Sequence, residues 1–394
     1  MSSFAIVRWS LALAVATLPA VPLAAPADPI VLRGATAAPV PDEIPVALLV
    51  DLSSGQTLFA RDADRRFVPA SVTKVMTAYT AFHLIEQGRI APDTLVTISQ
   101  EVAELWSGEG SSMFLEAGDR LSVGELLLGI TTVSANDASV ALAIAATGSQ
   151  QAWLALMNAN AVELGMRDTR FGTPNGWPDE GRTYTSARDL AVLAEALTTR
   201  YPELYRRYFG HRGMSYRKIT QANHDPVTGV VEGADGMKTG YTRQSGYNFL
   251  GSAERDGRRL VMVVAAAPTA AIRDKTARDL LRWGFDAFES RAILPARLPV
   301  GQARVQDGAG DRVTLRTVRP VLASVPQERA GDVRLSIRYR GPVAAPIAEG
   351  QPIAVLHVEV PGQEPNDLPL VAAEPVARAN WLQRLRNGLV GLVS

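Results

Sequence analysis

A serine and a lysine lie three positions apart in PASVTKVMTAYTAF, residues 69–82, at the start of an amphipathic run. Residues at this spacing share one face of a helix. A neutral amine can accept the proton of a neighbouring hydroxyl, and free N–H groups at a helix start favour developing negative charge. The pair therefore predicts a nucleophile, Ser71, and a base, Lys74, provided that burial or a second cation lowers the lysine pKa from about 10.4. A surface turn is the alternative, because this spacing is common by chance.

A second polar group, Ser134-Ala135-Asn136, lies between two apolar helical runs in TTVSANDASVALA. The Ser134 hydroxyl could relay a proton, and the Asn136 amide could hold a substrate carbonyl or the lysine base. A simpler interpretation is a helix N-cap, since serine and asparagine are favoured caps.

A third group, Lys238-Thr239-Gly240, comes just before a late hairpin in EGADGMKTGYTRQSGYNFLGSAE. Glycine lets a ligand approach the strand backbone closely, and a lysine beside a threonine could clamp a carboxylate. A charged turn is the alternative interpretation.

The elements that must position these groups follow from periodicity. One hairpin is predicted from Val46–Leu52 and Gln56–Ala60, and a second from segments flanking the turn Arg255-Asp256-Gly257. A helix is predicted from about 70 to 87, and further helical patterns at 122–134, 138–148, 150–165, 186–201 and 272–290. Strands at both ends with helices between predict an α/β (α+β) unit that closes through an antiparallel sheet of N- and C-terminal strands.

Length and composition favour an exported globular protein. The chain has 394 residues, which favours two folded units, and 47% are apolar with zero formal net charge. The neutral balance gives no indication of nucleic-acid binding. The chain has no cysteine, which excludes thiolate chemistry and disulfides. Residues 1–27 resemble a secretory signal peptide, with Arg8, an apolar core and small residues, although an uncleaved anchor is the alternative.

The composition changes at about residue 290. The segment 290–376 is rich in valine, proline and glycine with alternation, which predicts a small all-β domain after a catalytic domain at 40–289. Segment 377–394 predicts a basic amphipathic helix for a membrane surface; a helix packed on its own domain is the alternative. Its apolar positions are Trp381, Leu382, Leu385, Leu389, Leu392 and Val393, and its polar face has Gln383, Arg384, Arg386 and Asn387.

In this order, Ser-x-x-Lys, Ser-x-Asn and Lys-Thr-Gly are typical of penicillin-binding proteins and class A β-lactamases. The chain resembles the serine D-alanyl-D-alanine carboxypeptidases, the low-molecular-mass penicillin-binding proteins, most strongly over residues 40–289. The resemblance implies a β-lactamase/transpeptidase-like catalytic domain with a helical subdomain. It also implies removal of the terminal D-alanine from peptidoglycan stem pentapeptides, with β-lactams as inhibitors, no cofactor and no metal.

The resemblance also implies roles for individual residues. Ser71 would be acylated, Lys74 would be its general base, and Ser134 would pass a proton toward the leaving amine beside Asn136. The backbone N–H groups of Ser71 and Tyr241 would form the oxyanion hole. The substrate-binding strand would comprise Lys238, Thr239, Gly240, Tyr241 and Thr242.

Two departures from the family pattern leave the substrate contacts open. Tyr241 stands where many relatives have histidine, and Asn223-His224 stands where relatives often have an Asn-Arg pair. Arg243 and His224 are therefore the candidates to meet the substrate carboxylate.

Other functions remain possible within the same chemistry. A D,D-endopeptidase that cleaves cross-links would use the same residues. A β-lactamase is disfavoured because TPNGWPDEGRTYTS has no glutamate with an asparagine at the spacing expected for fast deacylation. The intact motif residues disfavour a non-catalytic β-lactam-sensing module.

The four histidines, His83, His211, His224 and His357, show no metal-ligand spacing. The implied location is periplasmic, at the outer face of the cytoplasmic membrane.

Overall fold

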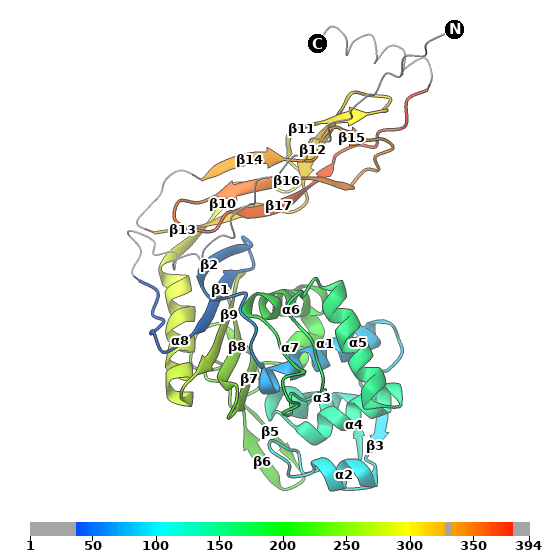
Figure 1. Ribbon diagram of the computed structural model, residues 1–394, viewed down its shortest axis with the longest axis vertical. Helices are drawn as coiled ribbons and strands as arrows, with labels where there is room; N and C mark the ends of the chain where they lie inside the picture. Colours follow the sequence, from blue (N-terminus) through cyan, green and yellow to red (C-terminus); the bar gives the residue numbers. More distant parts are fainter. Residues whose placement is uncertain (1–36, 328–332, 381–394) are drawn as a thin grey trace, which may run out of the picture.

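A computed structural model describes residues 37–327 and 333–380 (Figure 1). The predicted signal peptide and residues 381–394 of the predicted C-terminal helix lie outside the described residues. The start of that helix at 377 is wrong, because residues 377–379 belong to the β domain. Arg378 forms a β-bridge with Gly308, and the Ala379 N–H donates to the carbonyl of Asp307 at 2.8 Å.

A five-stranded antiparallel sheet forms the centre of the first domain, in the order β2-β1-β9-β8-β7. As predicted, the N-terminal hairpin joins strands that come late in the sequence. The strands are β1 (Val46–Asp51), β2 (Gln56–Arg61), β7 (Ala234–Thr242), β8 (Gly246–Arg255) and β9 (Arg258–Ala267). Asp256 and Gly257 have φ values of 50° and 75°, as a two-residue hairpin turn requires.

Both faces of the sheet are packed against other elements, and the central strands β1 and β9 are accordingly largely apolar. In β1, Val46 and Leu48 face the helical side, whereas Ala47 and Leu49 pack with α8 (Ala270–Asp286) on the other side. Figure 1 shows α8 alone on one face and the helical subdomain on the opposite face.

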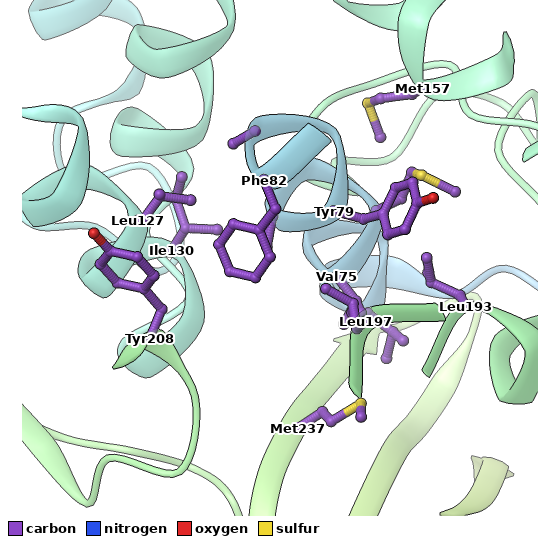
Figure 2. Close-up of a cluster of buried hydrophobic side chains, with 14 of the residues drawn as sticks. Val75, Tyr79, Phe82, Leu127, Ile130, Met157, Leu193, Leu197, Tyr208 and Met237 are labelled. Carbon is purple, nitrogen blue, oxygen red and sulfur yellow. The ribbon is translucent and has the colours of Figure 1, made fainter. Parts of the chain in front are cut away.

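Helix α1 (Lys74–Glu86) runs through the centre of the helical subdomain and is buried on nearly every side. Its Val75, Tyr79 and Phe82 pack among apolar side chains of neighbouring helices (Figure 2). The other helices are α2 (Gln100–Trp106), α3 (Val123–Thr132), α4 (Asn136–Thr147), α5 (Gln150–Glu163), α6 (Ala187–Arg200) and α7 (Pro202–Tyr208). Among the described residues, no single helix is long and apolar enough to cross a membrane; only the bent pair α4–α5 reaches that length and composition together.

Two short ribbons complete this domain. Strands β3 (Leu95–Thr97) and β4 (Arg120–Ser122) pair beside α3, and β5 (Gly213–Tyr216) and β6 (Ile219–Ala222) form a hairpin before β7.

The second domain is all-β, as predicted. A six-stranded sheet has the order β14-β16-β17-β12-β11-β15, and β10 pairs with β13. Their bounds are β10 (Phe288–Leu294), β11 (Pro299–Gln306), β12 (Arg312–Thr317), β13 (Val321–Pro326), β14 (Arg334–Arg338), β15 (Val343–Ala344), β16 (Pro352–Glu359) and β17 (Asn366–Ala372).

A buried polar network joins the two domains. Asp51 at the end of β1 is fully buried, and its carboxylate accepts hydrogen bonds from Arg258 Nε at 2.7 Å and from Ser324 Oγ of β13 at 2.5 Å. Gln56 of β2 donates to Gln363 Oε1 at 2.5 Å and accepts from the Ser324 N–H at 2.6 Å. Satisfied polar groups at a buried junction define one orientation of the hairpin against the β domain.

Candidate active site

Ser71 lies in a 3-10 turn (Ala70–Thr73) that leads directly into α1. The sequence predicted an α-helix from about residue 70, so the regular helix begins four residues later than expected. The turn packs against β7: a Cβ atom on Gly240 would lie 2.4 Å from the Pro69 carbonyl oxygen and 3.1 Å from the Ser71 nitrogen. Only glycine at 240 permits this approach, which places the Ser71 backbone beside the strand.

Lys74 is buried, and its Nζ has three neighbours at hydrogen-bond distance. It donates to Asn136 Oδ1 at 2.7 Å and to the carbonyl oxygen of Asn175 at 2.7 Å, and it lies 2.9 Å from Ser71 Oγ. Burial lowers the pKa of Lys74 well below its usual value, and the charge of Lys238 lowers it further, against an opposing effect of Asp137. A neutral amine has two N–H bonds and one lone pair. In the neutral form of Lys74 the two oxygens would accept both N–H groups, and the lone pair would then face the Ser71 hydroxyl.

Asn136 is held in the orientation that this arrangement needs. It is the first residue of α4, its Nδ2 donates to the Glu109 carbonyl at 2.8 Å, and its backbone N–H donates to the Ser111 carbonyl at 2.8 Å. The amide oxygen is thereby left for Lys74. The side chain is not an N-cap, and no side-chain cap bond is present at this helix start.

Ser134 has a left-handed backbone, with φ of 63°, just before α4. Non-glycine residues in this region carry strain that surrounding contacts must offset. Its Oγ is buried and has no hydrogen-bond partner within the described part of the chain. The hydroxyl is therefore free to bond a ligand in the cleft.

Lys238 lies in β7 and is 3% exposed. Its Nζ donates to the Thr239 carbonyl at 3.0 Å. Burial lowers the pKa of Lys238 to about 7; Asp225 opposes this effect and Arg273 adds to it. The group is thus a second amine near Lys74, and its charge is set by the groups around it.

These residues meet at a cleft of about 610 Å³ between the helical subdomain and β7. Lys74 and Lys238 are buried and are not among the residues that line it, but Lys74 contacts Ser71 and Asn136, which are. The other sequence-predicted residues line it: Ser71, Ser134, Asn136, His224, Thr239, Gly240, Tyr241, Thr242 and Arg243. The structure therefore brings together three motifs that are separated by up to 167 positions in the chain, from 71 to 238.

Sequence reasoning missed three residues of this site. Asn175 contributes a backbone carbonyl to Lys74, Arg273 of α8 lines the cleft with a buried side chain, and Trp177 forms part of its wall. Every residue has a backbone carbonyl, so the contact of Asn175 could not be predicted from its residue type. Arg273 is one of several cationic residues in a helical pattern, and nothing in the sequence distinguishes it from the others. The only available signal was the segment TPNGW, which contains both Asn175 and Trp177.

His224 lies on the cleft wall near two cations. Burial lowers the pKa of His224, and Lys238 and Arg273 lower it further, with Asp274 opposing. Arg273 lies with its guanidinium 5.9 Å from the Tyr247 ring and pairs with Asp274 at 2.6 Å. Three cationic or ionisable groups, His224, Arg243 and Arg273, therefore line this side of the cleft.

Comparison with known proteins agrees with the geometry. Residues 36–269 match the D-alanyl-D-alanine carboxypeptidase family, and residues 288–378 match the C-terminal domain of penicillin-binding protein 5. The chain is 34% identical over 357 residues to the D-alanyl-D-alanine carboxypeptidase DacD of Escherichia coli, covering 88% of this chain and 91% of the relative. It is 30% identical over 346 residues to DacF of Bacillus subtilis, covering 86% and 87%.

Solved structures are similar over most of the chain or over a smaller part of it. The structure of penicillin-binding protein 5 from Haemophilus influenzae has a TM-score of 0.75 and 31% identity, covering 87% of this chain and 100% of that one. Penicillin-binding protein D2 of Listeria monocytogenes, solved in an ampicillin-bound form, has a TM-score of 0.56 and 27% identity, covering 62% and 98%. With the family match extending over more than half of its residues, the chain belongs to the D-alanyl-D-alanine carboxypeptidase family.

Proposed function

We propose that this enzyme removes the terminal D-alanine from peptidoglycan stem peptides through an acyl-enzyme at Ser71. The observation that carries the proposal is the surroundings of Lys74. Its two carbonyl acceptors at 2.7 Å and its lowered pKa leave an amine lone pair 2.9 Å from the Ser71 hydroxyl. A base within this distance of a nucleophile is the geometry that proton transfer requires.

In the acylation step, Lys74 takes the Ser71 proton as Oγ bonds to the carbonyl carbon of the penultimate D-alanine. The peptide C–N bond then breaks, and the terminal D-alanine leaves after its nitrogen gains a proton. Ser134, whose Oγ is free and lines the cleft, is placed to pass that proton. Water then hydrolyses the ester and regenerates Ser71.

The carbonyl oxygen becomes negative in this step and needs donors. We assign these to the backbone N–H groups of Ser71 and Tyr241, because Gly240 lets β7 approach the Ser71 nitrogen closely. Removing one donor of this kind typically costs about 100- to 1,000-fold in rate.

The carboxylate of the terminal D-alanine meets the cationic side of the cleft. Arg273 is the strongest candidate, since its guanidinium is buried and can form paired hydrogen bonds to a carboxylate. Arg243 and His224, proposed from the sequence, line the same side. Thr239 on β7 can donate its hydroxyl to the same group.

We further propose that the enzyme acts outside the cytoplasmic membrane and is held there by its C-terminal residues. Residues 1–27 have the pattern of a secretory signal. Residues 381–394 combine Trp381 and regularly spaced leucines with two arginines, as expected for a segment that binds a membrane surface. The substrate polymer lies next to that membrane, so surface attachment raises the encounter rate.

The test is release of free D-alanine from a synthetic stem pentapeptide by the purified enzyme and by Ser71→Ala. Wild type should release D-alanine and form one covalent adduct with a β-lactam, on a peptide that contains Ser71; the variant should do neither. A stable adduct in Ser71→Ala would refute the nucleophile. Cleavage of cross-linked dimers without action on pentapeptides would show an endopeptidase instead.

A further inference from the structure

Asp137 follows Asn136 in α4 and is fully buried, yet the proposed reaction gives it no role. A buried carboxylate is costly unless hydrogen bonds and nearby charges stabilise it. Its place in the first turn of α4 helps, because the helix dipole favours negative charge there, and its Oδ1 accepts from the Ala138 N–H at 2.9 Å. Its other neighbours belong to the surroundings of the active site.

The Asp137 carboxylate binds the backbone of a loop, residues 108–115, from an earlier part of the chain. Its Oδ2 accepts from Ser112 Oγ at 2.6 Å and from the Leu115 N–H at 3.1 Å. Its Oδ1 accepts from the Met113 N–H at 3.1 Å. One side chain therefore holds three successive points of this loop against the start of α4.

Ser112 extends this network through the loop. Its Oγ accepts from the Gly108 N–H at 3.0 Å and from the Phe114 N–H at 2.8 Å, while it donates to Asp137. Phe114 has a left-handed backbone, with φ of 61°, a conformation that surrounding contacts must offset. The loop contains no helix or strand, so these side-chain bonds take the place of a backbone ladder in defining its course.

The same loop orients Asn136. The Asn136 Nδ2 donates to the Glu109 carbonyl, and its backbone N–H donates to the Ser111 carbonyl, each at 2.8 Å. With Nδ2 bound in this way, the amide oxygen accepts from Lys74 Nζ at 2.7 Å. Asp137 thus holds the loop, the loop holds Asn136, and Asn136 binds one N–H group of Lys74.

Asp137 also acts on Lys74 through its charge. Two charged groups face the Lys74 amine, Lys238 of β7 and Asp137 of α4. Burial and Lys238 lower the pKa of Lys74, whereas Asp137 opposes them. When Lys74 takes the Ser71 proton, it becomes an ammonium group in a buried site, where a nearby carboxylate stabilises the positive charge.

We propose that Asp137 is a positioning residue for acylation: it holds the loop that orients Asn136, and it offsets the charge that Lys74 gains with the serine proton. This inference rests on the proposed function. The proton moves from Ser71 Oγ to Lys74 Nζ as Oγ bonds to the carbonyl carbon, and Asp137 neither gives nor takes a proton. Because Asp137 does not line the cleft, its effect on the reaction passes through Asn136 and Lys74.

The experiment measures the rate of labelling by a fluorescent penicillin as a function of pH. Asp137→Asn keeps the size of the side chain, removes its charge and places an N–H group among donors. It should label roughly 10- to 100-fold more slowly at the optimal pH, because a small misplacement in an active site can cost this much. Its acid limb should also move to lower pH, since the pKa of Lys74 loses the group that raises it.

Ser112→Ala separates the two effects. It removes one hydrogen bond to Asp137 and keeps the carboxylate, so labelling should slow by roughly 3- to 10-fold while the acid limb stays at the wild-type pH. This variant also keeps the inference testable when Asp137→Asn fails to fold. Labelling of Ser112→Ala at the wild-type rate would then overturn it.

The matched control is Asp189→Asn. Asp189 is likewise a buried acid in the first turn of a helix, α6, and it does not line the cleft. Its Oδ2 accepts from the Asp168 N–H at 2.8 Å and from Thr169 Oγ1 at 2.6 Å, so it also holds a segment that precedes its helix. This variant should lower the urea midpoint as Asp137→Asn does, and keep the wild-type labelling rate and acid limb.

Three results would overturn the inference. A wild-type labelling rate in Asp137→Asn would, as would a slower rate with an unshifted acid limb, which is the behaviour of a residue that only supports the fold. An acid limb that moves equally in Asp189→Asn would show that the effect is not specific to Asp137. Absence of a penicillin adduct at Ser71 in the wild type would refute the proposed nucleophile and this inference with it, whereas the three results above leave the nucleophile in place.

Discussion

Lys74 shows how the surroundings of a lysine can favour its neutral form, which the proposed base must have. A lysine in water is protonated at neutral pH, but burial disfavours its charged form and Lys238 repels it. Asn136 and Asn175 then offer only oxygens to its N–H groups. The sequence motif gives the spacing of serine and lysine. Burial and Lys238 favour the deprotonated amine, and the two oxygens orient its lone pair toward Ser71.

We expect Lys74→Arg to lose acylation by roughly 100- to 10,000-fold, the usual contribution of a general base. Arginine keeps the positive charge but does not deprotonate, and its planar fork differs in shape from an amine. The measurement is the second-order rate of labelling by a fluorescent penicillin. Lys275→Arg, at a residue whose side chain is 78% exposed, is the control and should label at the wild-type rate. Wild-type labelling of Lys74→Arg would remove the base assignment.

The pH dependence of acylation should be bell-shaped. Lys74 must be neutral, so the rate falls when pH drops through its lowered pKa. Lys238 must be charged, and its pKa is about 7, so the rate falls as pH rises through that value. In Lys238→Arg the charge persists at high pH, and the alkaline limb should vanish while the acid limb remains. Stopped-flow acylation between pH 4 and 10 is the measurement, and an unchanged alkaline limb in the variant would assign it to another group.

For individual residues of the site, the sequence predicted the residue types but not all of the contacts. Ser71, Lys74 and Asn136 were predicted from their motifs, and the structure places them within hydrogen-bond distance. Asn175 acts through its backbone, which any residue possesses, so no pattern could reveal it. Arg273 comes close to His224 only because α8 packs on the sheet, a tertiary contact without local periodicity.

Among the elements, β7 and the 3-10 turn that packs against it matter most for positioning the site. The prediction of an antiparallel sheet of N- and C-terminal strands is confirmed. The 3-10 turn before α1 was not predicted, because apolar periodicity continues through it and only its packing against β7 distinguishes it. The position of the small β domain in the chain could be predicted from composition. Its junction with the N-terminal hairpin depends on contacts between distant residues, which no local pattern reveals.

The contribution of that junction to the stability of the protein can be tested by mutation. Asp51→Ala removes the carboxylate that pairs with Arg258 and accepts from Ser324, and leaves a nearly buried guanidinium without its counter-ion. Breaking a buried pair in this way typically costs about 3–5 kcal/mol. We expect the urea midpoint of the full chain to fall accordingly. Lys275→Ala, which breaks an exposed pair with Asp279, is the control and should cost about 0–1 kcal/mol. A midpoint for Asp51→Ala equal to that of the control would show that the network does not stabilise the junction.

For the whole molecule, the arrangement separates catalysis from the C-terminus. The active-site cleft lies in the first domain, and the described chain ends at the far end of the β domain (Figure 1). The polar network at Asp51 fixes the N-terminal hairpin to β13, so the β domain can act as a spacer. An enzyme attached at its C-terminus would then hold its cleft away from the membrane, toward the polymer.

The proposed membrane attachment through residues 381–394 predicts that the full mature chain and a shortened chain differ in liposome binding. The full mature chain should pellet with anionic liposomes, and a chain ending at Asn380 should not, because residues 381–394 contain Trp381, the leucine stripe and the two arginines. The cut spares the hydrogen bonds of residues 377–379 with the β domain. The affinity should fall at high salt, since part of it is attraction to anionic lipid. Both chains should release D-alanine from a free pentapeptide at the same rate, which controls for folding. Equal pelleting of the two chains at low salt would place the membrane contact elsewhere, or show that these residues do not bind lipid.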